Sequence, residues 1–355
     1  MNSIRILSSF VIGLLSCLQT TCVYSHAPNI EAHSIVIISK DWDLNGKSVV
    51  LPEGVTLKFK NAKIHNGKLQ GNHTKIAGSA DAIFDKVEIS GTWNVPVIST
   101  DMFVNLDYDN SLRDVIALTD SNVQNKVIIG KGDYLFSLNK SDQTGIIVGS
   151  NTKLIINGNL KLKRNDLRNY DIVRVTGTDI SISGNGTIIG DLSTHIDNGG
   201  EWGMGIYLKG AIDVSISGIS VKNCWGDCIY IGGNSQNVVV ENCSLAYGRR
   251  QGVSITFGSN IKLRDLRISN VGGTNPQYGI DIEPNADGKV EDVFISNVSI
   301  EDCKGGILVY GGAKGAHVGK VVIEDCKIYN SSKVPINVKK CETVQIIGNT
   351  LIGKK

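Results

Sequence analysis

The second half of the chain repeats one short pattern, V-x-I-x-(G/N/D), at intervals of 23 to 32 residues. Each of the six regular copies carries a further apolar residue seven positions after its first residue. The regular copies begin at Val214, Val238, Ile261, Val293, Val321 and Val344, with earlier copies at Leu154 and Ile180. A repeat of this length, made of strand-like triplets and turns, indicates a stacked solenoid.

A second strand with its own register lies between successive copies. Its triplets include Ile206-Tyr-Leu208, Ile229-Tyr-Ile231 and Ile280-Asp-Ile282, in which the outer residues are apolar. This is the period-2 pattern of a strand with one buried face. A leucine-rich repeat has a similar period but needs regular Leu positions and a helical segment, and the sequence has neither. The pattern predicts an all-β fold, a right-handed, single-stranded parallel β-helix whose coils stack roughly 4.8 Å apart.

Composition fits a turn-dense all-β chain, with 40 Gly, 6 Pro and few aromatic residues. The net charge is +2 and there is no basic block, so we expect no nucleic-acid partner. An uninterrupted solenoid counts as one domain. We therefore predict a single β-helix domain over 28–355, with opening coils and a cap helix in 28–140 and regular coils in 141–355.

The first residues have the pattern of an export signal. Arg5 lies in a basic segment that precedes the apolar run from Ile6 to Leu15, which is too short to span a membrane. Two cleavage sites are consistent with it: a lipobox that ends at residue 16 and leaves Cys17 lipidated, which we favour slightly, or cleavage after Ala27. Both predict an exported protein, which is periplasmic, extracellular or an outer-membrane lipoprotein of a Gram-negative bacterium.

The cysteines after the signal are predicted to be free thiols. They are Cys224, Cys228, Cys243, Cys303, Cys326 and Cys341. Export permits disulfides, but Cys243 and Cys326 share a column three coils apart. That separation is roughly 14 Å, too far for a bridge. A Cys224–Cys228 bridge is conceivable within one turn, although Cys228 is expected to point inward.

Residues 28–100 show less regular strands. They are expected at 48–51, 55–59, 75–76 and 87–89, with turns at Gly46, Gly54, Gly67 and Gly71. A short helix follows, with an apolar face formed by Leu112, Val115, Ile116 and Leu118 and a cap at Asp109, Asn110 or Ser111.

This capped helix, followed by the strand 126–129 and the turn at Gly132-Asp-Tyr134, resembles the opening segment of pectate-lyase-like proteins. The segment from Leu44 to Leu57 is also similar to the start of secreted β-helix proteins of gut Bacteroides. The resemblance implies the right-handed β-helix fold. One such fold hosts lyases, hydrolases, epimerases and adhesins, so function must be argued from the site.

The second strand, read across coils, predicts which side chains lie together on its outer face. Its middle column runs Arg174, Tyr207, Tyr230, Ser254, Asp281, Leu308 and Asn337. Neighbouring columns supply Asp227, Tyr278 and Glu283. At the preceding turns Trp202, Trp225 and Arg249 are expected to stack, with Arg250 next to the last of them. The longest insertion, between Ile189 and Gly205, adds His195 and Glu201. Aromatic rings pack on sugar rings, while Arg and carboxylates bind hydroxyls and acidic groups, so these residues predict a glycan groove.

The polygalacturonase pattern, N-x-D, D-D, G-H-G and R-x-K, is matched at one position only. Asp227 fits the second acid of the pair. Met204, Gly226 and Gln251 stand where the pattern requires its other acids and its His, and Asp281 and Glu283 stand where it requires Arg and Lys. The sequence therefore does not support a polygalacturonase mechanism.

Three kinds of function remain for the groove. A polysaccharide lyase, which we favour narrowly, needs a base for the proton α to a uronate carboxylate and a cation that neutralises this carboxylate. The candidate catalytic residues are Asp227, Arg250, Asp281, His195 and Tyr230. The candidate substrate-binding residues are Glu201, Trp202, Tyr207, Trp225, Arg249, Tyr278 and Glu283.

The alternatives are a uronate epimerase, a glycoside hydrolase and a glycan-binding or adhesive protein without catalysis. Asp281 and Glu283, two residues apart on a strand, are roughly 6.5–7 Å apart, near the lower limit for an inverting pair. No metal site or cofactor is assigned, although Asp227, Asp281 and Glu283 could hold Ca²⁺. The expected partner is a polysaccharide, without a transmembrane segment, and the sequence does not distinguish a monomer from a homotrimer.

Overall fold

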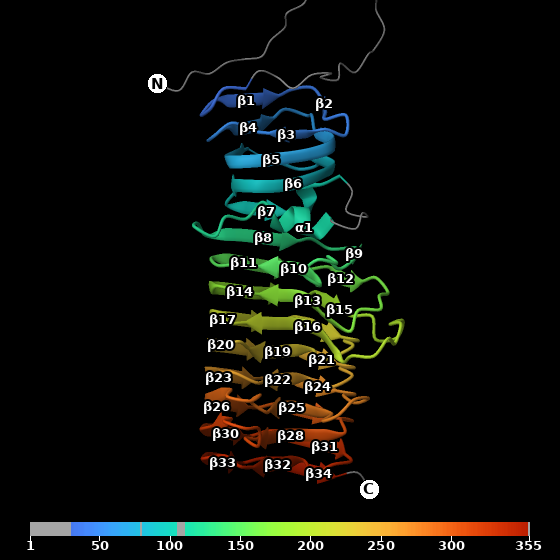
Figure 1. The fold of residues 1–355 in the computed structure, drawn as a ribbon, viewed down its shortest axis with the longest axis vertical. Helices are drawn as coiled ribbons and strands as arrows, with labels where there is room; N and C mark the ends of the chain where they lie inside the picture. Colours follow the sequence, from blue (N-terminus) through green and yellow to red (C-terminus); the bar gives the residue numbers. More distant parts are fainter. Residues whose placement is uncertain (1–29, 79, 105–110, 354–355) are drawn as a thin grey trace, which may run out of the picture. The chain divides into compact units, whose positions relative to one another are not determined.

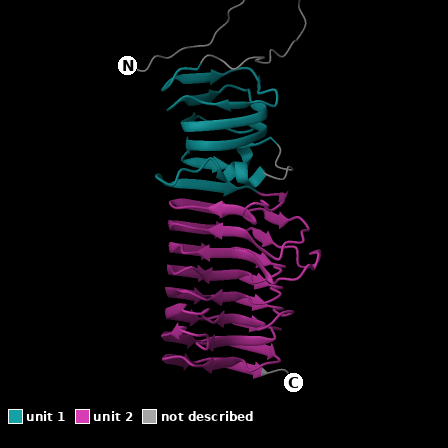
Figure 2. Ribbon diagram, viewed as in Figure 1, with its two compact units in different colours: residues 1–130 teal, residues 131–355 magenta. Residues whose placement is uncertain are grey.

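The computed structural model describes residues 30–78, 80–104 and 111–353. It divides into two compact units, 1–130 and 131–355, shown in teal and magenta in Figure 2. The predicted export signal, with both cleavage sites, lies outside the described residues. So do Asp109 and Asn110, two of the three proposed helix caps.

The second unit consists of three parallel sheets, which we name sheets I, II and III (Figure 1). Sheet I contains, in spatial order, β10 (Thr144–Val148), β13 (Asn169–Val175), β16 (Trp202–Lys209), β19 (Ile229–Gly232), β22 (Val253–Ile255), β25 (Tyr278–Ile282), β28 (Gly305–Tyr310) and β32 (Ile336–Lys339). In sheet II of this unit lie β11 (Thr152–Ile156), β14 (Thr178–Gly184), β17 (Ile212–Ser217), β20 (Ser235–Glu241), β23 (Gly258–Arg264), β26 (Lys289–Ser296), β30 (Lys320–Glu324) and β33 (Thr343–Ile347), with β29 (His317–Val318) beside β26. Sheet III contains β9 (Asp133–Phe136), β12 (Asn159–Leu162), β15 (Thr187–Ile189), β18 (Ser220–Lys222), β21 (Ser244–Ala246), β24 (Arg267–Ser269), β27 (Ser299–Glu301), β31 (Lys327–Ser331) and β34 (Thr350–Gly353).

Each regular coil therefore contributes one strand to each sheet, and each strand pairs with the same strand of the next coil. This is the predicted parallel β-helix. Its core consists of columns of identical or similar apolar side chains. The column on sheet I, fully buried throughout, contains Val173, Ile206, Ile229, Val253, Ile280 and Ile307. Burial of each such side chain stabilises the fold by about 1.5–3 kcal/mol.

The G/N/D position of the repeat forms the corner between sheets II and III. Every residue there has a positive φ: Gly218 (74°), Asn242 (53°), Asp265 (55°), Asn297 (49°), Asp325 (52°) and Gly348 (65°). Gly, Asn and Asp are the residues that adopt this left-handed conformation most readily. The conformation thus explains why the repeat accepts only these three residues.

The first unit contains β1 (Ile35–Ile38), β2 (Trp42–Asp43), β3 (Ser48–Val50), β4 (Thr56–Phe59), β5 (Ile64–Ala77), β6 (Phe84–Asn94), β7 (Val97–Ser99), a short 3-10 helix (Thr100–Met102), α1 (Ser111–Ile116) and β8 (Asn125–Ile129). The strand pairs in this unit are parallel, as in β1–β4 and β5–β6. Helix α1 packs on β6, where the Ile89 amide donates to Asp114 Oδ1 at 2.8 Å. The predicted role of this helix as a cap on the coils stays a prediction.

Two predicted turns are wrong. Gly67 and Gly71 lie inside β5 rather than at its ends. Glycine is needed at both positions because side chains from neighbouring coils approach the backbone. A Cβ on Gly67 would lie 2.5 Å from Leu44 Cβ, and one on Gly71 would lie 2.6 Å from the Trp93 ring. Gly46 and Gly54 have positive φ values of 72° and 67°, as turn residues require.

The six cysteines of the described residues are free, as predicted. Five are buried, and Cys341 is partly exposed. The five buried thiols occupy small core positions of the coils.

Candidate functional site

The outer face of sheet I carries the predicted column of polar and aromatic residues. The pairing register runs Arg174, Tyr207, Tyr230, Ser254, Asp281, Leu308 and Asn337. Adjacent strands in this column are roughly 4.8 Å apart. The register therefore places side chains from residues 174 to 337 along one row.

A cavity of about 420 Å³ opens on this row over β19, β22 and β25. Its walls include Trp202, Tyr230, Arg250, Asp281 and Glu283, all predicted site residues. Ser254, Thr256 and the segment 284–286 complete its lining together with Ala313. We refer to this space as the acidic cavity, because Arg250 is its one cation against two carboxyls.

A hydrogen bond from the buried Gln251 side chain fixes the orientation of the Asp281 carboxyl. Only 5% of this residue is exposed, and its Oδ2 accepts a hydrogen bond from Gln251 Nε2 at 2.8 Å. The Gln251 amide cannot turn over, because its oxygen accepts from the Tyr278 amide at 2.7 Å. Asp281 Oδ1 is buried and has no hydrogen-bond partner among the residues that the structure describes. A proton on this carboxyl is therefore expected on Oδ1, since Oδ2 is engaged as an acceptor.

The two carboxyls of the cavity differ in environment. Burial raises the pKa of Asp281 well above its ordinary value, and the negative charge of Glu283 raises it further. Burial also raises the pKa of Glu283, while the nearby Arg250 charge lowers it. Asp281 is almost fully enclosed and Glu283 is half-buried. Asp281 is thus the group more strongly held in its protonated form.

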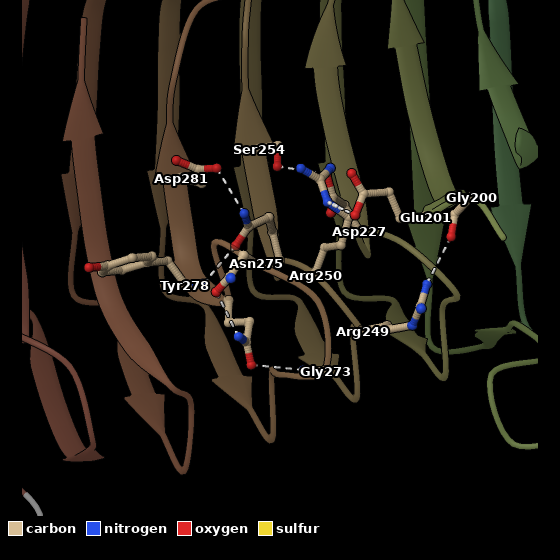
Figure 3. A network of polar contacts seen from close by, with 12 residues as sticks. Gly200, Glu201, Asp227, Arg249, Arg250, Ser254, Gly273, Asn275, Tyr278 and Asp281 are labelled. Atoms are coloured by element: carbon tan, nitrogen blue, oxygen red, sulfur yellow. Dashed lines mark hydrogen bonds and ion pairs between the residues drawn. The ribbon is translucent and has the colours of Figure 1, made fainter. Parts of the chain in front are cut away.

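Arg250 lies between two further carboxylates, as Figure 3 shows. Its guanidinium is 3.6 Å from Asp227 Oδ2 and 3.9 Å from Glu201 Oε2. Asp227 is fully buried and accepts a hydrogen bond from Ser254 Oγ at 2.7 Å. Burial raises the pKa of Asp227, and the Arg250 charge opposes that effect. Asp227 therefore helps to position the Arg250 guanidinium through their ion pair. Asp227 itself is not among the residues that line the acidic cavity.

Arg249 points away from the acidic cavity. Its guanidinium lies 3.6 Å from the centroid of the Trp225 ring, and its Nη1 donates to the Gly200 carbonyl at 3.1 Å. The predicted stack of Trp225 and Arg249 is therefore present. It fastens the 190–201 loop to the coil.

His195 also contacts Trp225, the ring on which Arg249 stacks, and it does not line the acidic cavity. Its side chain is fully buried, with the ring stacked 4.0 Å from Trp225 and Nδ1 2.9 Å from Asp191 Oδ2. Asp191 also accepts hydrogen bonds from Asn165 and from the Tyr170 hydroxyl. The sequence placed His195 beside the groove as a catalytic candidate. The structure gives it a position that holds the loop in place.

The two remaining tyrosines of the predicted site, Tyr207 and Tyr278, do not line the acidic cavity. Tyr207 packs edge-on against Tyr230 with ring centroids 5.0 Å apart. Burial raises the pKa of Tyr207. Tyr278 is buried, and its hydroxyl accepts from Asn337 Nδ2 at 3.2 Å. Neither residue is part of the cavity lining.

Gln251, Ser254 and Thr256 have contacts in the site that the sequence did not assign. Ser254 was visible in the middle column, and Gln251 and Thr256 were visible in its neighbours. Their polar partners were not, because a column gives a residue's position without its hydrogen bonds. Thr256 Oγ1, for example, donates to the Tyr230 hydroxyl at 2.9 Å.

Within the described ranges, no group of three or more His, Cys, Asp or Glu side chains is arranged to hold a metal ion. The carboxyls considered for Ca²⁺ thus do not form a metal-binding cluster. In the same ranges, none of the helices has the length and apolar character needed to cross a membrane.

Part of the chain matches a β-helix family in sequence. Residues 136–290 match the family model described as right handed beta helix region. The SPbeta prophage-derived protein YorA of Bacillus subtilis (strain 168) is 27% identical over 258 residues, which cover 64% of this chain and 43% of YorA. The chain thus spans less than half the length of this curated relative.

Two solved structures were also similar. The catalytic domain of a GH87 α-1,3-glucanase is 10% identical, with a TM-score of 0.45, and the match covers 96% of this chain and 60% of that one. The alginate lyase AlyF is 12% identical, with a TM-score of 0.42, and the match covers 92% of this chain and 84% of that one.

Proposed function

The chain is a right-handed parallel β-helix, and we propose that it hydrolyses a glycosidic bond of a polysaccharide. The observation that carries this proposal is the pair of carboxyls, Asp281 and Glu283, in one cavity with different environments. Glycosidases use such a pair, with one carboxyl protonated and one ionised.

The environments assign a role to each carboxyl. Asp281, the more strongly buried group, keeps its proton and donates it to the oxygen of the leaving sugar. Glu283 is ionised and removes a proton from the attacking water. Because their positions along the strand differ by two residues, their separation of roughly 6.5–7 Å leaves room for that water. The proposal therefore predicts inversion at the anomeric carbon.

An exposed aromatic ring gives the sugar an apolar surface beside these carboxyls. Trp202 is 45% exposed and lines the acidic cavity. Tyr230, with its hydroxyl held by Thr256, lies in the same wall. Such rings bind the apolar face of a sugar while their edges leave its hydroxyls accessible.

The geometry favours hydrolysis over the elimination that the sequence narrowly suggested. A lyase, like a uronate epimerase, needs a free cation to neutralise the uronate carboxylate. Arg249 stacks on Trp225, outside the acidic cavity. Arg250 faces the cavity, but Asp227 and Glu201 already flank it. The charge there therefore opposes a uronate at the reacting position.

Product analysis tests the proposal. The purified protein is incubated with a panel of neutral and acidic polysaccharides, and new reducing ends and ultraviolet absorbance of unsaturated sugars are both followed. We expect reducing ends without that absorbance, released about 10²–10⁴-fold more slowly by Asp281→Asn. Unsaturated product would establish the lyase, and binding without either product would establish a glycan-binding protein. The predicted export signal fits a polysaccharide substrate and is part of the same proposal.

A further inference from the structure

A second cavity of the same unit has the opposite charge. It measures about 310 Å³ and lies over the loop between β12 and β13. Lys140, Lys163 and Arg164 line it, with Asp166 as the one carboxylate among its lining residues. Three positive groups against one negative group leave a net charge of +2. We call this space the basic cavity.

Two of these cations are free to bind a ligand. The Lys140 and Arg164 side chains are exposed and have no ion pair or hydrogen bond with any residue that the structure describes. Two exposed cations beside a third, Lys163, raise the local concentration of anions around the cavity. Arg also offers the planar donors that match a carboxylate or a sulfate.

The walls of the basic cavity are built in advance. Asn165 donates to the buried Asp191 through its side chain at 2.8 Å and orients Leu167 through a 2.9 Å hydrogen bond. The Ile196 amide donates to the Asn165 carbonyl at 2.9 Å. The network that holds His195 thus also fixes this cavity, because both depend on Asp191. A preformed site loses little entropy when a ligand binds.

The basic cavity also has an apolar side. Ile196, 44% exposed, and Leu138, which is buried, both belong to its lining. An anion alone gains nothing from such surface, whereas a sugar ring that carries an anionic group uses both. The combination of cations and apolar surface matches an acidic sugar unit.

We propose that the basic cavity binds a carboxylate- or sulfate-bearing sugar of the polysaccharide, at a distance from the bond that is cleaved. The loop at 163–168 precedes β13, and Asp281 lies on β25, four coils further along sheet I. Four steps of about 4.8 Å separate the two positions by roughly 19 Å along the coils. This inference rests on the proposed function for the nature of the ligand, and it names the substrate as a glycan with acidic units away from the cleaved bond.

Binding measurements on an inactive variant test the inference apart from catalysis. Asp281→Asn is titrated calorimetrically with galacturonate oligomers and with their carboxyl-reduced forms. The same is done with sulfated galactan oligomers and their desulfated forms, which distinguishes the two anionic groups. We expect at least one acidic probe to bind about tenfold more tightly than its neutral form, with a preference that weakens as salt increases.

The preference must then depend on the two free cations. Adding Lys140→Ala and Arg164→Ala is expected to remove it and leave the binding of neutral oligomers unchanged. Lys153→Ala is the control, because Lys153 is an exposed lysine on β11 that does not line the cavity. Equal binding of acidic and neutral probes, or an equal loss in the control, overturns the inference. If hydrolysis is not observed but the preference persists, the proposed function fails while the anionic site stands.

Discussion

The strands of sheet I have two faces that differ in what they tolerate. The inner face repeats Ile or Val in every regular coil, as at Ile206, Ile229 and Ile280. The outer face, at the very next positions, carries in order Tyr207, Tyr230, Ser254 and Asp281. The same backbone ladder therefore supports a uniform core and a variable row of polar groups. Because the ladder fixes position on both faces, the outer row can place chemical groups precisely enough for catalysis without changing the fold.

Substitutions of two neighbouring residues of β25, Asp281 and Ile280, test the difference between the outer and the inner face. The largest expected effect on activity comes from Asp281, on the outer face. Asp281→Asn keeps the size of the side chain and removes the proton that the leaving sugar needs. Loss of a general acid is expected to lower kcat by about 10²–10⁴-fold. Steady-state rates on the polysaccharide found by product analysis measure this effect. Full activity in this variant would remove Asp281 from the mechanism.

Ile280→Ala, one residue away, tests the inner face. Its side chain is fully buried in the column between Val253 and Ile307. Removing it leaves a cavity and is expected to lower the free energy of unfolding by about 2–5 kcal/mol. Chemical denaturation measures the loss, and the rate per folded molecule is expected to stay near that of the wild type. Asp281→Asn serves as the matched control, since it should not destabilise the fold.

The sequence predicted the fold well because the fold is periodic. Copies of V-x-I in phase with Gly, Asn or Asp indicate both the buried columns and the left-handed corners. The first unit was predicted less accurately, since two of its glycines are required by close packing and not by a turn. Gly67 and Gly71 make room for Leu44 and Trp93, and nothing in local sequence distinguishes such a glycine from a turn residue.

The site was predicted only as far as the coil register extends. The register placed Tyr230 and Asp281 in one row, which the pairing confirms. It did not indicate that Arg249 donates a hydrogen bond to the Gly200 carbonyl, because side-chain direction in a turn depends on contacts that have no period. The insertion that carries His195 has no copy in other coils, so its folded position could not be read from the repeat.

A substitution of Gln251 tests stability and activity together, because its buried amide bonds both the backbone of Tyr278 and the carboxyl of Asp281 in the acidic cavity. Gln251→Ala removes the donor to Asp281 Oδ2 and leaves the Tyr278 amide without its acceptor. The second effect is expected to cost about 1–3 kcal/mol of stability. The first removes a hydrogen bond that favours the ionised carboxyl.

The rate profile separates the two effects of Gln251→Ala. Loss of the donor raises the pKa of Asp281, so the alkaline limb of kcat against pH should move to higher pH. A purely structural role would lower stability and leave that limb in place. Thr256→Val is the control, since it removes the hydroxyl that contacts Tyr230 and does not touch Asp281.

The raised pKa of Asp281 also makes stability depend on pH. An unfolded aspartate has a pKa of about 3.9, and burial holds the folded value well above that. Between the two values the folded state binds more protons, so stability falls as pH rises through this window. The Asn side chain of Asp281→Asn cannot ionise. The melting temperature of this variant, relative to that of the wild type, is therefore expected to rise from about pH 4 towards neutrality. A constant difference across this range contradicts the raised pKa.

The smallest expected effect concerns Trp202, on the open wall of the acidic cavity. Its ring is 45% exposed, so Trp202→Ala should change the free energy of unfolding by less than about 0.5 kcal/mol. Loss of the apolar platform is expected to cost about 1 kcal/mol of sugar binding, roughly fivefold in KM. Tyr247→Ala provides the control, because Tyr247 is a 49% exposed aromatic residue outside the cavity lining. A KM that rises equally in both variants would mean that exposed rings in general, and not this wall, bind the polysaccharide.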